Sequence, residues 1–432
     1  MSGIPAVSHW PKRCCEIPMF EPTDKPRVYA LPPGVDFPDA LVSGLLANSD
    51  PNAPEAMARI HLLLNTERMA RRVTDLFGRG QTRLLPRLSL LTGYAQTACP
   101  TALPASASAL RRRLELAQLI NALLDREPDL AGRDSLFDLS DSLAALMDEM
   151  QGEGVPPEAI RALDVSDLSG HWARAQRFLG ITEAYLAAQG EDALDPQARQ
   201  RRAVENLLAH WSVAPVRHPV ILAGSTGSRG TTAMLMAAIA RLPRGAIVLP
   251  GYDFDQPESV WEDMLGAIRD TDHRALSEDH PQFRYAKLMH MLDIGPSDIQ
   301  PWTKDDPPYP ARNRLISLAL RPAPITDSWL REGPSLKELD KATADVTLVL
   351  APDTRAEALA IALRLREAAE TGQVAALITP DRMLTRRVAA ALDLWNILPD
   401  DSAGLPLQLS PPGRFLRQVA SLFTKPLTVD AL

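Results

Sequence analysis

Short apolar runs, each followed by a polar loop and then by a helical pattern, constrain the fold of this chain more than any other feature. The clearest runs are RIHLLL (59–64), PVILA (219–223) and AIVL (246–249). Brief stretches rich in Val, Ile and Leu are typical of strands buried in a parallel sheet. The repeated order of strand, loop and helix therefore predicts an α/β fold with a parallel sheet.

The pattern of apolar residues changes between residues 96 and 215. Apolar residues such as Leu114, Leu139 and Leu143 recur there at helical spacing, and no convincing strand interrupts them. We therefore predict an all-helical insertion within the first α/β unit. The predicted organisation is a first α/β unit in two parts (19–95 and 216–342), the helical insertion (96–215), and a second α/β unit (343–432) with strands at 346–350 and 374–378.

The two ends also differ from the rest of the chain. Residues 1–18 show neither periodicity nor an apolar signal-peptide segment, so we expect a disordered leader with Met19 as the natural start. The final residues, PLTVDAL, resemble a helix cap followed by one unfinished turn, which is not stable alone. We therefore expect the second unit to be truncated.

Composition excludes several classes of protein. The chain has 432 residues, which suggests more than one domain, and its net charge is −8. Nucleic-acid contacts would thus need local basic patches or a partner. The three cysteines form no CxxC pair, and no apolar run approaches the roughly 18–20 residues that span a bilayer. We expect a reduced, cytoplasmic protein without a metal site or membrane segment.

The glycine-rich loop after the run at 219–223 resembles a phosphate-binding loop. Such loops have the pattern GxxxxGK[ST], whereas residues 225–232 have the sequence STGSRGTT. A threonine replaces the lysine that would contact phosphates, and no acidic residue lies between Val220 and Tyr252 to hold Mg²⁺. Three interpretations remain: a working nucleotide loop, a structural turn, or an oxyanion or DNA-phosphate site that uses backbone N–H groups and Arg229. The residues of this degenerate phosphate loop are Gly227, Gly230, Thr231 and Thr232.

Threonine and arginine residues follow two of the predicted strands. Such side chains at the carboxyl end of a strand can contact a DNA backbone, although a solvated helix face is the simpler interpretation. The candidate DNA-binding residues are Thr66, Arg68 and Arg71 in the first unit, Arg229 in the glycine-rich loop, and Thr379, Arg382 and Arg386 in the second unit. The arginine runs at 111–113 and 199–202 are predicted to be surface charge.

Catalytic carboxylates are not predicted. Asp353 and Asp381 each follow a proline, as in some nucleases, but no (D/E)xK strand comes after either. Asp253 and Asp255, after the run at 246–249, could in principle hold a metal, although capping and turn roles fit them better. We therefore predict no catalytic residue, no metal ligand and no cofactor in this chain.

Long stretches of the chain resemble AddB, the partner subunit of the AddAB-type helicase–nuclease, especially its alphaproteobacterial form. The resemblance covers nearly everything from Met19 onward and is weakest in the helical insertion. The stretches that carry it include RVYALPPGVDFPDALVSGL (27–45), RIHLLLNTERMARRV (59–73), LLPRLSLL (84–91), VILAGSTGSRGTTAMLMAAIARLPRGAIVLPGYDFD (220–255), ARNRLISLALRPAP (311–324) and RAEALAIALRLREAAETGQVAALITPDRMLTRRVAAAL (355–392).

The resemblance implies a superfamily 1 helicase-like fold, with RecA-like parallel sheets, that has lost its motor residues. It places residues 27–34 where a motor carries its phosphate loop, and the loop after 219–223 at the second nucleotide motif. The family also carries a carboxyl-terminal nuclease domain with a cysteine-bound iron–sulfur cluster, and no residue here matches those motifs. The implied role is DNA double-strand break repair by recombination, in which the chain binds DNA ends, single-stranded DNA and an AddA-type motor subunit. The alternatives are a divergent P-loop NTPase or kinase that uses residues 225–232, and a scaffold without DNA contact.

Overall fold

A computed structural model describes residues 19–424, except 51–52, 54, 80–81, 157, 163–178, 182–184, 186–192, 228–229, 270–277 and 405. The chain divides into two compact units, Met1–Ala344 and Asp345–Leu432. The expected leader (1–18) and the expected final turn (from Thr428) lie outside the described residues.

The first unit is built on a parallel sheet, as predicted. Its strands are β1 (Val28–Ala30), β2 (His61–Leu64), β3 (Arg87–Leu90), β6 (Val220–Ala223), β7 (Gly245–Leu249) and β8 (Gln300–Pro301). They lie in the order β3–β2–β6–β7–β1–β8, and every pair is parallel. The α/β, RecA-like fold class is therefore confirmed for the described part of this unit.

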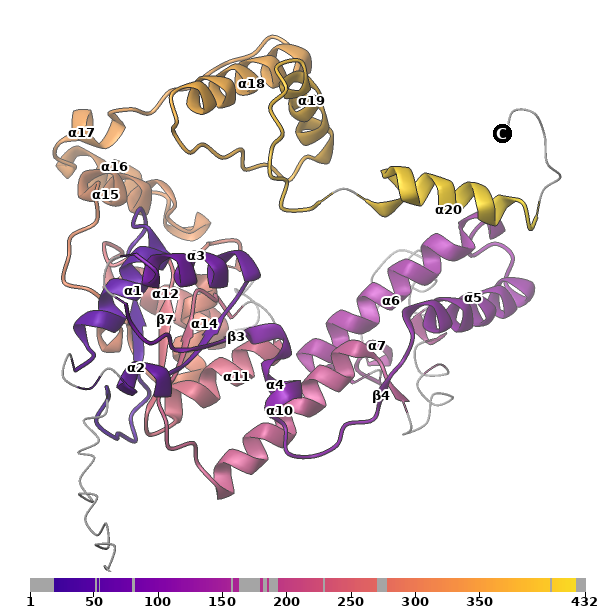
Figure 1. The fold of residues 1–432 in the computed structure, drawn as a ribbon, viewed down its shortest axis with the longest axis horizontal. Helices are drawn as coiled ribbons and strands as arrows, with labels where there is room; N and C mark the ends of the chain where they lie inside the picture. Colours follow the sequence, from indigo (N-terminus) through magenta and orange to yellow (C-terminus); the bar gives the residue numbers. More distant parts are fainter. Residues whose placement is uncertain are drawn as a thin grey trace, which may run out of the picture. The chain divides into compact units, whose positions relative to one another are not determined.

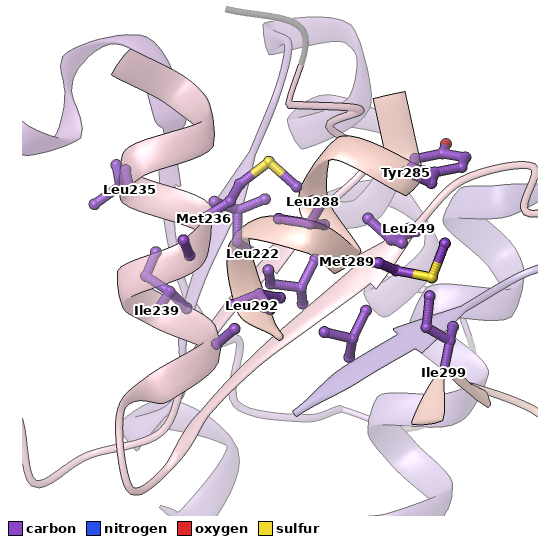
Figure 2. Packing of buried hydrophobic residues seen from close by; sticks show 14 of the residues in the cluster. Leu222, Leu235, Met236, Ile239, Leu249, Tyr285, Leu288, Met289, Leu292 and Ile299 are labelled. Carbon is purple, nitrogen blue, oxygen red and sulfur yellow. The ribbon is translucent and has the colours of Figure 1, made fainter. Parts of the chain in front are cut away.

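Both faces of the sheet are buried. Successive side chains of a strand point to opposite sides, so β2, β6 and β7 each contribute to both apolar clusters. On one face, Ile221 and Val248 pack with α1 (Phe37–Ala47) and α3 (Glu67–Phe77). On the other face, Leu222 and Leu249 pack with α11 (Gly230–Arg241) and α14 (Phe283–Leu292), as Figure 2 shows. The helices α10 (Pro196–Val213) and α12 (Glu258–Arg269) complete this second layer.

Local sequence signals set the helix starts next to the strands. The carboxylate of Asp36 accepts a hydrogen bond from the Asp39 N–H and caps α1. The hydroxyl of Thr66 does the same for α3, at 3.2 Å from the Met69 nitrogen. The sheet is thus followed by well-capped helices at its carboxyl edge.

The helical insertion contains α5 (Ala109–Arg126), α6 (Leu136–Glu153) and α7 (Glu158–Arg161). The helices α5 and α6 lie side by side (Figure 1) and run antiparallel, since Arg112 near the start of α5 bonds to Asp148 near the end of α6. Their contact buries Leu116, Ile120 and Leu143. One feature was not predicted: a two-residue parallel ladder joins β4 (Ala105–Ser106) to β5 (Ala193–Leu194).

The region 271–335 has more regular structure than the sequence suggests. Besides α15 (Pro310–Ala319), it contains α14, which buries Phe283 and Met289 in the core. Its helical pattern is short and lies among prolines, so tertiary packing decides it. The remaining short elements of this unit are α2 (Glu55–Arg59), α4 (Leu91–Ala98), α16 (Ser328–Glu332), α17 (Leu339–Thr343) and the 3-10 turns η1 (Arg133–Ser135), η2 (Pro296–Asp298), η3 (Ala323–Ile325) and η4 (Gly333–Ser335).

The second unit contains α18 (Thr354–Glu370), α19 (Arg382–Asp393), η5 (Leu407–Leu409) and α20 (Pro411–Ser421). The first two helices pack through Ala362, Leu384 and Val388. The strands predicted at 346–350 and 374–378 are wrong: neither segment forms a strand in the described structure, and Leu350 and Ile378 are 86% and 94% exposed. A strand needs a neighbour for its backbone hydrogen bonds, so an apolar run alone does not make one.

Candidate functional site at the carboxyl edge of the sheet

The carboxyl ends of β3, β2 and β6 meet at one edge because these strands are parallel neighbours. A cavity of about 660 Å³ lies there, which is within the size range of ligand pockets. Two helices of the insertion side, α6 and α10, form its other wall. Its polar lining residues are Asn65, Thr92, Asp148, Glu149, Glu153, Gln197, Gln200, Ser225, Thr231 and Thr232.

The amino terminus of α11, where a phosphate loop would hold its anion, contacts a carboxylate of this same chain. The Gly230 N–H donates to Glu153 Oε1 at 2.7 Å, and the Thr231 hydroxyl donates to the Gly152 carbonyl at 3.0 Å. Gly230 permits this approach, because an added Cβ would lie 2.5 Å from Glu153 Oε2. A helix amino terminus attracts anions, and here the anion is the end of α6. The loop therefore forms a junction between α6 and α11.

The other residues of the predicted phosphate loop have mainly conformational roles. Gly227 has a φ of +67°, which glycine adopts without strain, and its N–H donates to the Ser225 hydroxyl at 3.3 Å. Thr231 is buried, and Thr232 lines the cavity. Arg229, the cation predicted for this loop, lies outside the described residues.

The loops after β2 and β6 are joined by a residue that the sequence analysis missed. Asn65 Nδ2 donates to the Gly224 carbonyl at 2.6 Å. Gly224 has a φ of +80°, and a Cβ there would lie 2.8 Å from the Met69 sulfur. The signal available in the sequence was an asparagine at the end of a predicted strand, at an edge where a second loop was expected.

The predicted DNA-binding residues of the first unit lie on or before α3. Thr66 uses its hydroxyl as the helix cap, while Arg68 and Arg71 are exposed. Arg71 lies 3.6 Å from Glu67, and both side chains are about three-quarters exposed. An ion pair as exposed as this contributes little and competes weakly with a phosphate.

The predicted residues of the second unit have a similar local arrangement. The Thr379 hydroxyl accepts a hydrogen bond from the Asp381 N–H at 3.0 Å, which stabilises the turn before α19. Arg382 lies 3.6 Å from Asp401, and Arg386 is exposed. The two predicted groups thus belong to separate units of the chain.

The carboxyl end of β7 carries the two aspartates considered as metal ligands. Asp253 is buried and accepts a hydrogen bond from the Asp255 N–H at 3.0 Å, so it stabilises a turn. Burial raises the pKa of Asp253, and burial together with the Asp253 charge raises the pKa of Asp255. Within the described part of the chain, no group of three or more His, Cys, Asp or Glu is arranged to hold a metal ion.

One of the arginines predicted as surface charge is buried instead. Arg112 Nη1 lies 2.6 Å from Asp148, and its Nε lies 3.4 Å from the fully buried Asp195. The Tyr185 hydroxyl also donates to Asp195, at 3.2 Å. This network joins α5, α6 and the start of α10. In the same way, Arg199 is bonded to the Pro104 carbonyl and Gln96, so it is not merely surface charge.

No family model matches the chain, and no curated protein matches its sequence. Among the helices of the described residues, none combines the length and apolar character needed to cross a membrane.

Proposed function

We propose that this chain is an AddB-type, non-motor subunit of a DNA double-strand-break repair helicase–nuclease. In this proposal it binds DNA and an AddA-type motor subunit during end resection for recombination. The observation that carries the proposal is the Glu153 carboxylate at the Gly230 N–H of α11, because it occupies the position where a working phosphate loop at residues 225–232 would hold its anion. The RecA-like sheet supports the helicase ancestry, and the carboxylate supports the loss of nucleotide chemistry.

Electrostatics at this edge disfavour a triphosphate. The loop has no lysine, and the Thr231 hydroxyl already donates to the Gly152 carbonyl. Asp148, Glu149 and Glu153 line the neighbouring cavity and would repel phosphate groups. The lysine charge that holds phosphate in a working loop is therefore missing, and Thr232, which stands at the magnesium-binding hydroxyl position, lines this acidic cavity.

Accessible cations support the DNA-binding part of the proposal. Arg68 and Arg71 are exposed in the first unit, as are Arg382 and Arg386 in the second. Exposed arginines near the start of a helix, as in α3 and α19, are suited to contacts with sugar-phosphate backbones. We propose that Arg68 and Arg71 line a groove for single-stranded DNA on the first unit, and that Arg382 and Arg386 contact the strand from their own unit.

The test of the groove is the affinity of the full chain for a fluorescent single-stranded oligonucleotide. Replacing all four exposed arginines by alanine is expected to weaken binding at least about tenfold and to reduce its salt dependence. The matched control removes four exposed arginines elsewhere, two in each unit: Arg126, Arg284, Arg414 and Arg417. Equal affinity of the two variants would remove the groove from the proposal.

A nucleotide-binding measurement tests the alternative function, a divergent NTPase or kinase. The proposal expects no saturable ATP binding by the isolated chain. Tight ATP binding that is lost on Gly230→Ala would favour the alternative. Co-purification with an AddA-type motor subunit, monitored by size-exclusion chromatography, tests the proposed partner separately.

A further inference from the structure

The opposite edge of the same sheet carries a row of arginines. Arg87 begins β3, while Arg59, Arg217 and Arg244 lie within three residues before β2, β6 and β7. These four strands are consecutive neighbours and all parallel, so their amino ends follow one another along one edge. Neighbouring strands are roughly 4.8 Å apart, which brings together arginines that are distant in sequence.

This edge is hollowed where the arginines lie. A cavity of about 350 Å³ is lined by Arg59, Arg217, Arg244 and His218, together with the apolar side chain of Ile60. A second hollow of about 400 Å³ shares Arg217 and Arg244 with the first. The two hollows share Arg217 and Arg244, so the edge offers a partly apolar depression with three of the four arginines along it.

The charges of this row are mostly uncompensated. Within the described part of the chain, the guanidinium groups of Arg59, Arg87 and Arg217 form no hydrogen bond or ion pair. Arg244 donates to the Arg217 carbonyl at 3.0 Å, and Asp50 is the carboxylate in the lining of the first cavity. Free guanidinium groups in a chain of net charge −8 form a local positive patch.

The two histidines of this edge add no permanent positive charge. His61 Nε2 lies 2.9 Å from the Ser89 hydroxyl, and the two imidazole rings are 6.1 Å apart. Burial, followed by the charge of Arg87, lowers the pKa of His218, and burial is also the main cause that lowers the pKa of His61. The positive charge of the patch therefore comes from the arginines and persists at neutral pH.

We propose that this amino-edge patch, made of Arg59, Arg87, Arg217 and Arg244, is a phosphate-binding site for a nucleic-acid strand. A guanidinium group binds a phosphate through two parallel hydrogen bonds, and a row of them matches a ligand with repeated phosphates. This site is separate from the groove proposed above and does not depend on it.

The test uses the full chain and the double substitution Arg59→Ala with Arg217→Ala. Binding of a fluorescent single-stranded oligonucleotide is measured by anisotropy over a range of salt concentrations. We expect affinity to fall about tenfold and the slope of log K against log salt to shrink by about 1.4, since each single-strand phosphate contact contributes roughly 0.7. The double lysine variant, Arg59→Lys with Arg217→Lys, retains the slope because it keeps both charges.

The control is the charge-matched pair Arg126→Ala with Arg284→Ala, which lies on exposed helix faces of the same unit. Affinity of the Arg59/Arg217 variant equal to that of this control would overturn the site. Inorganic polyphosphate shares the phosphate chemistry, so it should compete with the oligonucleotide for the wild-type protein. Polyglutamate is the probe for an acidic protein. If the Arg59/Arg217 variant lost affinity for polyglutamate but kept its affinity for the oligonucleotide, the nucleic-acid assignment would be overturned in favour of an acidic protein.

The outcome is distinguishable from failure of the proposed function. If the amino-edge variant loses affinity while the variant of Arg68, Arg71, Arg382 and Arg386 does not, the patch stands and the groove fails. The reverse result removes the patch and leaves the groove. Unchanged affinity in both variants removes both.

Discussion

The two edges of the parallel sheet differ in how their polar groups are used. At the carboxyl edge, the Gly230 N–H and Asn65 amide are bonded to other parts of the chain, and Asp253 closes a turn. At the amino edge, Arg59 and Arg217 have no partner among the described residues. Ligands of α/β sheets usually bind at the carboxyl edge. In this chain that edge contributes to the stability of the fold, whereas the amino edge has charge available for a ligand.

The comparison predicts its largest effect where the helical insertion is held together above the carboxyl edge. Arg112→Ala removes the guanidinium group that lies 3.4 Å from the buried Asp195 and should lower the free energy of unfolding by about 3–5 kcal/mol. Arg111→Ala is the matched control, because the Arg111 side chain is 75% exposed and its ion pair in the described structure is with the next-turn residue Glu115. The measurement is urea unfolding followed by circular dichroism. Equal midpoints for the two variants would contradict the assignment of Arg112 to the core of the insertion.

The next effect concerns the junction between α6 and α11. Gly230→Ala introduces a Cβ 2.5 Å from Glu153 Oε2 and 3.0 Å from the Glu153 Cα, so the two helices must separate. We expect a loss of about 1–3 kcal/mol in unfolding free energy. Gly266→Ala, in the exposed interior of α12 with nothing within 4 Å, should instead gain up to about 1 kcal/mol. A gain at both positions would mean that the junction is not closed in solution.

A pH effect is expected from the buried carboxylate after β7. Because burial raises the pKa of Asp253, its folded form binds a proton more readily than its unfolded form. Stability therefore falls as pH rises from the ordinary carboxyl pKa through the raised folded pKa, and the loss persists at neutral pH. Asp253→Asn should flatten this fall and also relieve the repulsion that raises the pKa of Asp255.

Denaturant midpoints from acidic to neutral pH measure this effect. The control is Asp24→Asn, the same chemical change at an exposed position. If Asp253→Asn and the wild type showed the same dependence of stability on pH, the pKa of Asp253 would not differ between the folded and unfolded states.

The sequence was sufficient to predict the sheet of the first unit but not the partners of its polar groups. Strands at 61–64 and 220–223 follow from short apolar runs, and the Asp36 and Thr66 caps follow from local chemistry. Arg112 was predicted as surface charge because its neighbours in sequence are also arginines. Its burial depends on Asp148 and Asp195, which only the packing of α5 against α6 and α10 brings near.

The second unit shows the opposite limit. The runs at 346–350 and 374–378 have strand composition, yet they form no ladder in the described structure. The helices α18 and α19 do form, and their caps, Asp353 and Asp381, are local in sequence. Pairing of strands is a non-local property, so composition alone overestimates it.

The smallest expected effect is the sharpest test of the difference between the edges. In the absence of nucleic acid, Arg59→Ala with Arg217→Ala should change the unfolding free energy by no more than about 0.5 kcal/mol, since no hydrogen bond or ion pair is lost. The same type of substitution at Arg112 should cost several times more. If the amino-edge variant proved as unstable as the Arg112 variant, its arginines would be structural too. Both edges would then stabilise the fold alone, and the available charge that the amino-edge patch requires would not exist.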